Sequence, residues 1–420
     1  MRKTTPVGTW STSMRGTAAT GANAVDQTSV RSSNLSLVLS EIFAAGGGLS
    51  RADVAARTGL TRATVSRLVK DLLDAGLVEE EAPNGLQKQG RPSTPLFPSS
   101  RVVVGIGLEV NVDHMQGMAI DLSGEVIDSF AVEGDFARSD PQQVLTELGR
   151  HANELVRNLR EQGIIELAGV VLGIPGIVDA PSGTVIYAPN LNWRNVEPFG
   201  LMNIEGIEGC PVSTYNDADL QAVCAAIELE ADGVAPSSFI YLSVDTGIGG
   251  AIFVDGSKMT GQCGWAGEIG HTSVDPEGPL CHCGARGCLE TYAGWRSMAA
   301  ASDINWRLGP AEMARRLEAG DAKAHEAIER AGRAFGIALA NAIKLLDILT
   351  VVLGNATKPV AQWLMPALRK ELDSRLLVVK PEEIQVLIVE QQGHLAARGA
   401  ALRAIQDRLI DPDGVGVKLN

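Results

Sequence analysis

The sequence lacks an uninterrupted apolar run of about 18 residues, the length that a membrane-spanning helix needs. Its first residues are basic and then polar, without the apolar stretch of a secretory signal. Basic residues are also few: the 420 residues include 36 Lys and Arg but 50 Asp and Glu, which gives a formal charge of −14. We therefore expect a cytoplasmic protein without a membrane span. Taken whole, this charge argues against a general nucleic-acid binder, because phosphate contacts need clustered cations.

The charge is distributed unevenly along the chain. Residues 1–30 carry three basic and one acidic side chains, and residues 31–96 carry eight and seven, which leaves −17 for residues 97–420. A near-neutral front end joined to an acidic body indicates two different functions in one chain.

The front end predicts a short tail followed by three helices. Residues 1–33 are rich in Ser, Thr, Ala and Gly and lack periodicity, which is typical of a disordered tail. Apolar residues then follow helical spacing from Asn34, and Ser50 and Thr61 are in place to cap a second and a third helix. Helix, glycine-containing turn, helix is the spacing of a helix-turn-helix.

The third helix predicts a DNA-contact face. Its exposed positions carry donors that can reach base edges and phosphates in a major groove, namely Thr61, Arg62, Thr64, Ser66, Arg67 and Lys70. A polar turn at 83–85 leads to a basic stretch with Lys88 and Arg91, which reads as a wing or a minor-groove arm. We assign residues 34–97 to a winged helix-turn-helix domain that binds operator DNA, with a linker at 93–100. A three-helix protein-interaction bundle with solvated charges is the alternative.

Residues 98–420 have the pattern of an α/β domain. Apolar strand-like runs alternate with amphipathic segments, which predicts mixed or parallel sheets covered by helices. The length of this part suggests two α/β lobes.

A cysteine cluster in this part indicates a metal site. Three of the six cysteines fall within eight residues, which favours a metal site in a reducing compartment over disulfides. With a nearby histidine they form the tetrahedral ligand set of structural zinc: His271, Cys281, Cys283 and Cys288. His282 is an alternative ligand, and three free cysteines in a loop are the alternative to any metal. Four protein ligands leave no open position, so the zinc loop 271–288 is assigned a structural role.

Two further motifs carry polar groups at the ends of strands. Asn216 and Asp217 lie at a strand-to-helix junction, where Asp217 is either a helix cap or a carboxylate that accepts a proton from a substrate hydroxyl. The Gly-rich segment 245–250 follows a strand and either presents backbone N–H groups to phosphate or forms a simple hairpin turn.

Several motifs occur in one order along the chain: GIPGIVD (173–179), APNLNW (188–193), YNDAD (215–219), TGIGGAIFVDG (246–256), AGEIGH (266–271) and CHCGARGCLE (281–290). Together they resemble the ROK family of sugar kinases and sugar-responsive repressors, over about residues 100–405. With the helix-turn-helix, the chain from about residue 34 resembles the repressor branch. The resemblance implies a two-lobed, actin-like and ribonuclease-H-like body that binds a hexose between its lobes.

The resemblance also implies residue roles. Sugar hydroxyls would be bound by Asn216, Asp217, Glu268, His271 and Glu290, with Gly176 and Asn190 in motifs that line the same cleft. Asp217 occupies the position of the catalytic base in the kinases, and His271 would serve both zinc and sugar. We also expect a homodimer or a dimer of dimers, because two recognition helices about 34 Å apart match a pseudo-palindromic operator.

Departures from the family pattern predict a sensor without kinase activity. The kinases carry D-x-G-G-T after the first strand, whereas this chain has Gly107-Leu108-Glu109-Val110-Asn111. The phosphate loop thereby loses its glycines and gains an anion, and Asp245 adds another anion in the second loop. Two alternatives remain, an active ATP-dependent hexose kinase with an appended DNA-binding domain, and a zinc-stabilised scaffold that binds no sugar.

Overall fold

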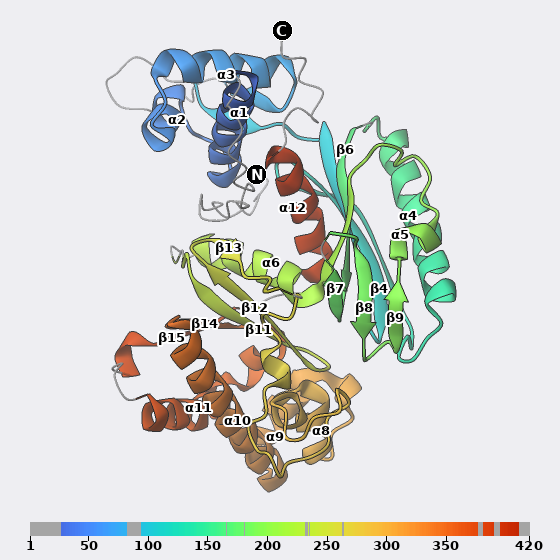
Figure 1. The fold of residues 1–420 in the computed structure, drawn as a ribbon, viewed down its shortest axis with the longest axis vertical. Helices are drawn as coiled ribbons and strands as arrows, with labels where there is room; N and C mark the ends of the chain where they lie inside the picture. The colour runs from blue at the N-terminus through green and yellow to red at the C-terminus, as the bar shows by residue number, and fades with distance from the viewer. Residues whose placement is uncertain are drawn as a thin grey trace. The chain divides into compact units, whose positions relative to one another are not determined.

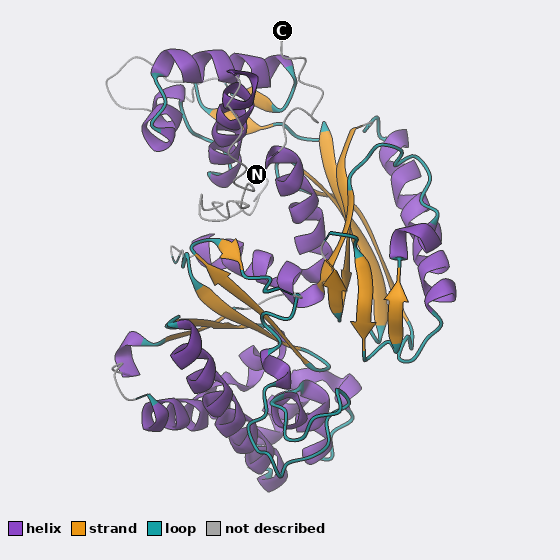
Figure 2. Cartoon of the chain, viewed as in Figure 1, coloured by secondary structure: helices purple, strands orange, loops and turns teal. Residues whose placement is uncertain are grey.

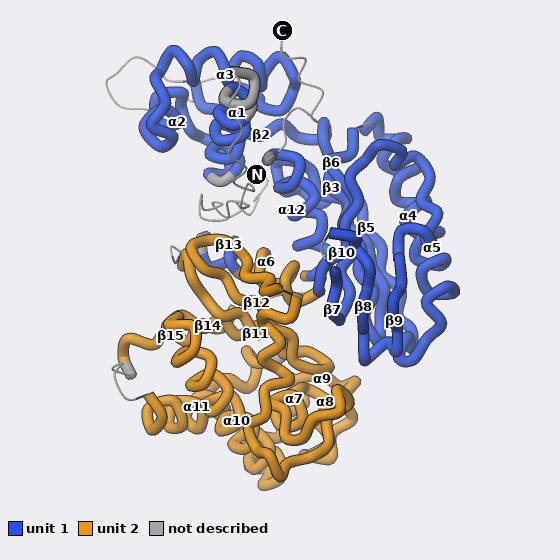
Figure 3. The backbone as a smooth tube through the Cα atoms, in the orientation of Figure 1, with its two compact units in different colours: residues 1–216, 226–235, 396–420 blue, residues 217–225, 236–395 orange. Residues whose placement is uncertain are grey.

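The computed structural model describes residues 27–81, 94–164, 166–179, 181–231, 234, 236–262, 264–376, 381–389 and 395–410. The expected tail therefore lies, up to residue 26, outside the described residues. Figure 1 shows the order of the elements, and Figure 3 shows the two compact units, residues 1–216, 226–235 and 396–420 in one and residues 217–225 and 236–395 in the other. Within the ranges just given, every helix is too short or too polar to cross a membrane.

The front of the first unit is a winged helix-turn-helix domain. Its elements are α1 (Gln27–Ala44), α2 (Arg51–Thr58), α3 (Arg62–Asp74), β1 (Val78–Glu80) and β2 (Leu96–Pro98). The caps predicted from the sequence are confirmed, because Ser50 and Asp53 form a reciprocal capping box and Thr61 accepts from the N–H of Thr64. The apolar faces of α1 and α3 meet in a core of Leu35, Val38, Leu39, Ile42, Val65, Leu68, Val69 and Leu72.

Two expectations about this domain were wrong. Helix α1 begins at Gln27, not at Asn34, and the extension is stabilised by an ion pair of 3.0 Å between Arg31 and Asp71 of α3. The segment 93–100 is not only a linker, because Leu96–Pro98 pairs antiparallel with β1 as the second strand of the wing. Leu96 is fully buried there, and that burial accounts for the pairing.

A lobe with a five-stranded sheet forms the rest of the first unit, in the order β10-β6-β3-β4-β5. The strands are β3 (Val103–Val110), β4 (His114–Asp121), β5 (Val126–Glu133), β6 (Glu166–Ile174) and β10 (Val212–Asn216). Strands β10, β6 and β3 are parallel, and β4 and β5 continue antiparallel. A small sheet of β7 (Ile177–Asp179), β8 (Thr184–Ala188) and β9 (Trp193–Val196) precedes the short helix α5 (Pro198–Met202).

Two long helices cover this sheet. Helix α4 (Pro141–Glu161) packs on β4 and β5 through a buried stripe that includes Leu145, Leu148 and Leu155. Helix α12 (Leu395–Ile410) approaches β3 so closely that a Cβ on Gly105 or Gly107 would overlap its backbone carbonyls. The absence of side chains at these two glycines therefore sets the distance between α12 and the sheet (Figure 1).

The second unit holds another five-stranded sheet, in the order β13-β12-β11-β14-β15. The strands are β11 (Phe239–Val244), β12 (Ile248–Val254), β13 (Ser257–Lys258), β14 (Thr350–Leu353) and β15 (Gln385–Ile388). Helix α6 (Asp217–Ala231) begins in this unit, which holds its residues 217–225. The other helices of the unit (Figure 2) are α7 (Glu290–Ala293), α8 (Trp295–Ala301), α9 (Gly309–Glu318), α10 (Ala322–Leu346) and α11 (Ala361–Arg375), with 3-10 turns at Ile269–His271, Trp306–Leu308, Asn355–Val360 and Pro381–Glu383. The predicted α/β class is thus confirmed in both lobes.

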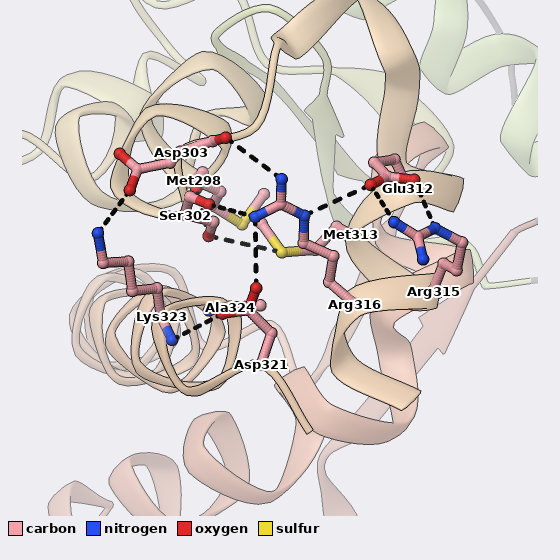
Figure 4. A network of polar contacts seen from close by, with 10 residues as sticks. All are labelled: Met298, Ser302, Asp303, Glu312, Met313, Arg315, Arg316, Asp321, Lys323 and Ala324. Carbon is pink, nitrogen blue, oxygen red and sulfur yellow. Dashed lines mark hydrogen bonds and ion pairs between the residues drawn. The ribbon is translucent and has the colours of Figure 1, made fainter. Parts of the chain in front are cut away.

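One arginine joins three helices of this unit (Figure 4). Arg316 of α9 donates to the carbonyl of Ser302 at 3.1 Å and to the carboxylate of Asp321 at 3.3 Å. Asp321 is the N-cap of α10, and Ser302 is the C-cap of α8. Arg316 also pairs with Glu312 on its own helix at 3.4 Å. This network satisfies a helix C-terminus and orients α8, α9 and α10 on one another.

Candidate functional sites

The predicted DNA-contact residues lie on the face of α3 opposite the core. Arg62, Ser66, Arg67 and Lys70 are exposed, and so is the cap residue Thr61. Thr64 is half-buried, and its hydroxyl lies 2.9 Å from that of Thr61. The hydrophobic residues of α3 lie on the other face of the helix and fill the core, so packing directs these polar side chains outward.

The cations of this face differ from the other arginines of the domain. Arg31 pairs with Asp71, Arg51 with Glu80, and Arg57 with Glu41 at 3.9 Å. By contrast, the side chains of Arg62, Arg67 and Lys70 form no ion pair with any residue that the structure describes. Their charge is therefore available for phosphate. Lys88 and Arg91 lie outside the described residues.

The four predicted metal ligands converge in the second unit. The donor atoms of His271, Cys281, Cys283 and Cys288 all lie within 4.8 Å of one another. Nδ1 of His271 is 3.7 Å from Sγ of Cys281, and Sγ of Cys283 is 3.7 Å from Sγ of Cys288. Two thiolates that bind one tetrahedral zinc at about 2.3 Å lie about 3.8 Å apart. The cluster thus has the spacing that a tetrahedral ion requires.

The chemistry of these donors also fits a metal. Burial lowers the pKa of His271, which favours the neutral imidazole that binds a cation. Burial raises the pKa of the Cys281 and Cys288 thiols, so a cation would supply the charge that stabilises their thiolates. Gly287 lets the loop return on itself, since its φ is 65° and a Cβ there would overlap the carbonyl of Asp275.

Three predicted sugar-binding residues lie beside this cluster. Nε2 of His271, the nitrogen turned away from Cys281, is 4.0 Å from Oε2 of Glu268. Glu290 begins α7 and accepts a hydrogen bond of 2.9 Å from the N–H of Ile248. Burial first, and then the charges of Asp219 and Glu290, raise the pKa of Glu268 to about 6, although Lys258 opposes this rise. The structure therefore brings Glu268, His271 and Glu290 close together, with the carboxylate of Asp219 near Glu268.

The pair of Asp219 and Lys258 was not predicted from the sequence. Asp219 is buried on the first turn of α6, two residues after Asp217, and the Lys258 ammonium of β13 donates to its carboxylate. Asp217 itself is the first residue of α6, and its Oδ1 accepts from the N–H of Ala218 at 2.9 Å. The only signal in the sequence was the position of Asp219 inside the YNDAD motif.

The remaining predicted sugar-site residues belong to the first unit. The side-chain amide of Asn216, at the end of β10, donates to the carbonyl of Gly176 at 2.9 Å. Gly176 packs against β8, where a Cβ would lie 2.6 Å from the carbonyl oxygen of Tyr187. Asn190 follows β8, and its carbonyl accepts from the N–H of Arg138 at 3.4 Å. The structure thus joins Asn216 to Gly176.

The segment 107–111, which departs from the kinase pattern, carries polar side chains that contact polar neighbours within the chain. Glu109 on β3 is only 2% exposed, accepts from the amide of Gln116 and lies 3.4 Å from Nε2 of His114. Nδ1 of His114 is 2.7 Å from the carboxylate of Asp113. Asn111 is also buried, and its side chain accepts from the N–H of Val112. The amide of Gln116 and the imidazole of His114 therefore face the carboxylates of Glu109 and Asp113 here.

Backbone donors of the segment 245–250 also have partners within the chain. The N–H of Thr246 donates to the carboxylate of Asp245 at 3.0 Å. The N–H of Ile248 donates to Glu290. Two amides that could face a phosphate are thus held by carboxylates.

Comparison with known proteins finds a matching family model for each part of the chain. A family model described as ROK family matches residues 105–407, and one described as MarR family matches residues 36–87. The chain is 27% identical over 380 residues to a protein of Caldicellulosiruptor bescii named xylose repressor, covering 87% of this chain and 94% of that one. It is 26% identical over 375 residues to an Escherichia coli protein named DNA-binding transcriptional dual regulator NagC, covering 84% and 88%.

A solved structure supports the fold. A structure described as a ROK family transcriptional regulator, homologous to the Escherichia coli MLC protein, matches with a TM-score of 0.74. The match covers 92% of this chain and 99% of that one at 23% identity. The predicted combination of a winged helix domain with a two-lobed, sugar-kinase-like body is confirmed.

Proposed function

The chain belongs to the ROK family, and on that premise we propose that it is a sugar-responsive transcriptional repressor of genes for carbohydrate uptake or metabolism. A DNA-binding domain ending near residue 98 would bind the operator, and the body that follows would bind the sugar. One observation carries this proposal: cations without ion-pair partners among the described residues line α3 in the same chain as a ROK body. Both relatives named above are regulators by their names.

Operator binding would use α3 in the major groove. Arg62, Arg67 and Lys70 would neutralise phosphates or reach base edges, and Thr61 and Ser66 would add hydroxyl donors. A homodimer, or a dimer of dimers, would present two such helices to a pseudo-palindromic site. Light scattering coupled to gel filtration tests this assembly, and a monomer at micromolar concentration would contradict it.

The effector would be a neutral sugar. Asn216, Asp217, Glu268, His271 and Glu290 would bind its hydroxyls, because carboxylates and amides each pair with two adjacent hydroxyls. The family resemblance adds Gly176 and Asn190 to this set. Anionic sugars are disfavoured, since Glu268 already lies close to the charges of Asp219 and Glu290. Relatives named xylose repressor and N-acetylglucosamine repressor match this chain at nearly equal identity, 27% and 26%, so identity does not select the effector.

A combined binding experiment tests the proposal. DNA fragments selected by the full chain from the genome of its source would be titrated by fluorescence anisotropy, with and without D-xylose, N-acetyl-D-glucosamine or D-glucose. We expect at least one sugar to change the DNA affinity by about tenfold, a coupling of about 1.4 kcal/mol. No specific DNA fragment, or no effect from any sugar in the panel, would contradict the proposal.

A structural zinc would be held by His271, Cys281, Cys283 and Cys288. A zinc with four protein ligands contributes order and charge compensation to the loop and has no open position for substrate. Metal analysis of the purified chain tests this assignment. One zinc per chain is expected, and purification free of metal with an intact fold would contradict it.

Phosphoryl transfer would be lost. The support is the buried carboxylate of Glu109 in the segment 107–111 and the carboxylate of Asp245 on an amide of the segment 245–250. An ATP-dependent hexose kinase with an added DNA-binding domain is the second candidate, favoured by the retained Asp217 at the position of the catalytic base. A coupled ADP-release assay over the sugar panel separates the two. Sugar-dependent turnover at ordinary enzymatic rates would establish the kinase.

A further inference from the structure

Each oxygen of the Glu290 carboxylate lies close to a group from another part of the second unit. Oε2 accepts from the N–H of Ile248 at 2.9 Å, and Oε1 lies 3.2 Å from Nδ1 of His282. The carboxylate fits beneath the segment 245–250 because Gly247 has no side chain, since a Cβ there would overlap Oε2. Glu290 is only 8% exposed, so water offers little replacement for these two donors.

His282 approaches Glu290 from the metal loop. It stands between Cys281 and Cys283, so its backbone is fixed on both sides by predicted ligands. Its Nδ1 is 4.0 Å from Sγ of Cys281, farther than from the carboxylate. Its ring meets that of His271 edge to face at a centroid distance of 5.5 Å. The carboxylate is therefore its nearer polar partner, and the neighbouring ring restricts its orientation.

We infer that His282 is a positioning residue that aims Glu290 at the sugar, an inference that depends on the proposed function for its ligand. In this inference the proton on Nδ1 of His282 faces Oε1, 3.2 Å away, while the N–H of Ile248 donates to Oε2. Each carboxylate oxygen can accept two hydrogen bonds, so one acceptor position on each oxygen remains for sugar hydroxyls. His282 thereby connects the metal loop to a sugar-binding carboxylate without being a metal ligand.

Hydrogen exchange tests this role without any sugar. In His282→Ala the donor is lost, whereas His282→Asn keeps an N–H at the position of Nδ1. On the zinc-loaded full chain, we expect faster exchange in peptides covering residues 245–250 in His282→Ala and restored protection in His282→Asn. Zinc content should equal that of the wild type in both variants. Unchanged exchange in His282→Ala, or loss of zinc from it, would overturn the inference, because the second result makes His282 a ligand.

Calorimetry supplies the second measurement, with whichever of D-xylose, N-acetyl-D-glucosamine and D-glucose binds the wild type. We expect His282→Ala to weaken binding by about tenfold, the low end for hydrogen bonds to charged groups, because the His282 side chain is 39% exposed. His282→Asn should restore most of the affinity, and His151→Ala in the first unit should change neither measurement. Wild-type affinity in His282→Ala would overturn the inference. If the wild type binds no sugar, the proposed effector fails, and the exchange measurement still decides the contact.

Discussion

The cluster around Glu109 predicts a pH-dependent contribution to stability. Burial of His114 opposes its positive charge, but hydrogen bonds to Asp113 and Glu109 outweigh this and raise its pKa from 6.5 to about 10. In His114→Gln the charge disappears, and among the described residues the buried carboxylate of Glu109 keeps the amide of Gln116 as its donor. We therefore expect the variant to be destabilised at any pH where the wild-type imidazole is charged.

The sign and size follow from linkage. A folded-state pKa above the unfolded value stabilises the protein fully below pH 6.5, and this contribution is lost as the pH rises toward about 10. The full shift corresponds to roughly 5 kcal/mol. Because the His114 side chain is 29% exposed, water screens the pair, and we expect about 2–3 kcal/mol near neutral pH.

Urea denaturation of wild type and His114→Gln across this pH range measures the effect. The difference in unfolding free energy should be largest at the acidic end and should shrink steadily toward pH 10. Glu109→Gln removes one of the two carboxylates, so the pH dependence should be weaker in that background. A difference that stays constant with pH, or one that grows as the pH rises, would refute the assignment of a charged His114.

Three further predictions concern the other sites. Arg67→Ala should weaken operator binding by about 1–3 kcal/mol and reduce its salt dependence by about one charge, whereas Arg333→Ala should do neither. Anisotropy titrations at several salt concentrations measure both effects. Unchanged DNA affinity in Arg67→Ala would show that α3 is not the recognition helix. Cys283→Ser should lower zinc content, melting temperature and sugar affinity together, and Cys210→Ser should spare all three; a stable, zinc-free variant with normal affinity would contradict this. Gly107→Ala should lower unfolding free energy by about 2–3 kcal/mol through overlap with α12, and an unchanged melting temperature would disprove that close approach.

Features set by neighbouring residues could be predicted from the sequence. The capping box of Ser50 and Asp53 and the cap at Thr61 depend on hydrogen bonds within one helical turn, so residue type and spacing are sufficient. The metal cluster was predictable for the same reason, because three of its four ligands lie in one short loop. His271 could be added because it follows Glu268 in a recognisable motif.

Features set by contacts between distant segments could not be predicted. The early start of α1 depends on an ion pair between residues 40 positions apart, Arg31 and Asp71. The strand at Leu96 has two prolines near it and reads as a linker until its pairing with β1 is known. Asp219 and its partner Lys258 are 39 positions apart, and neither residue alone indicates the other. Side-chain pairing across the fold therefore limits what local pattern can predict.

Side-chain pairing also bears on how a chain could lose phosphoryl transfer and still keep a sugar-binding site. Transfer from ATP depends on donors and cations that neutralise phosphate. In this chain Glu109 places a carboxylate in the first phosphate segment, and Asp245 holds the N–H of Thr246 in the second. Both changes introduce negative charge, and they lie on different lobes, so reversing one leaves the other in place. The carboxylates proposed to bind sugar hydroxyls, on Glu268 and Glu290, depend on neither change. On the proposed function, catalysis can therefore be lost by charge alone while the geometry for binding a neutral sugar is retained.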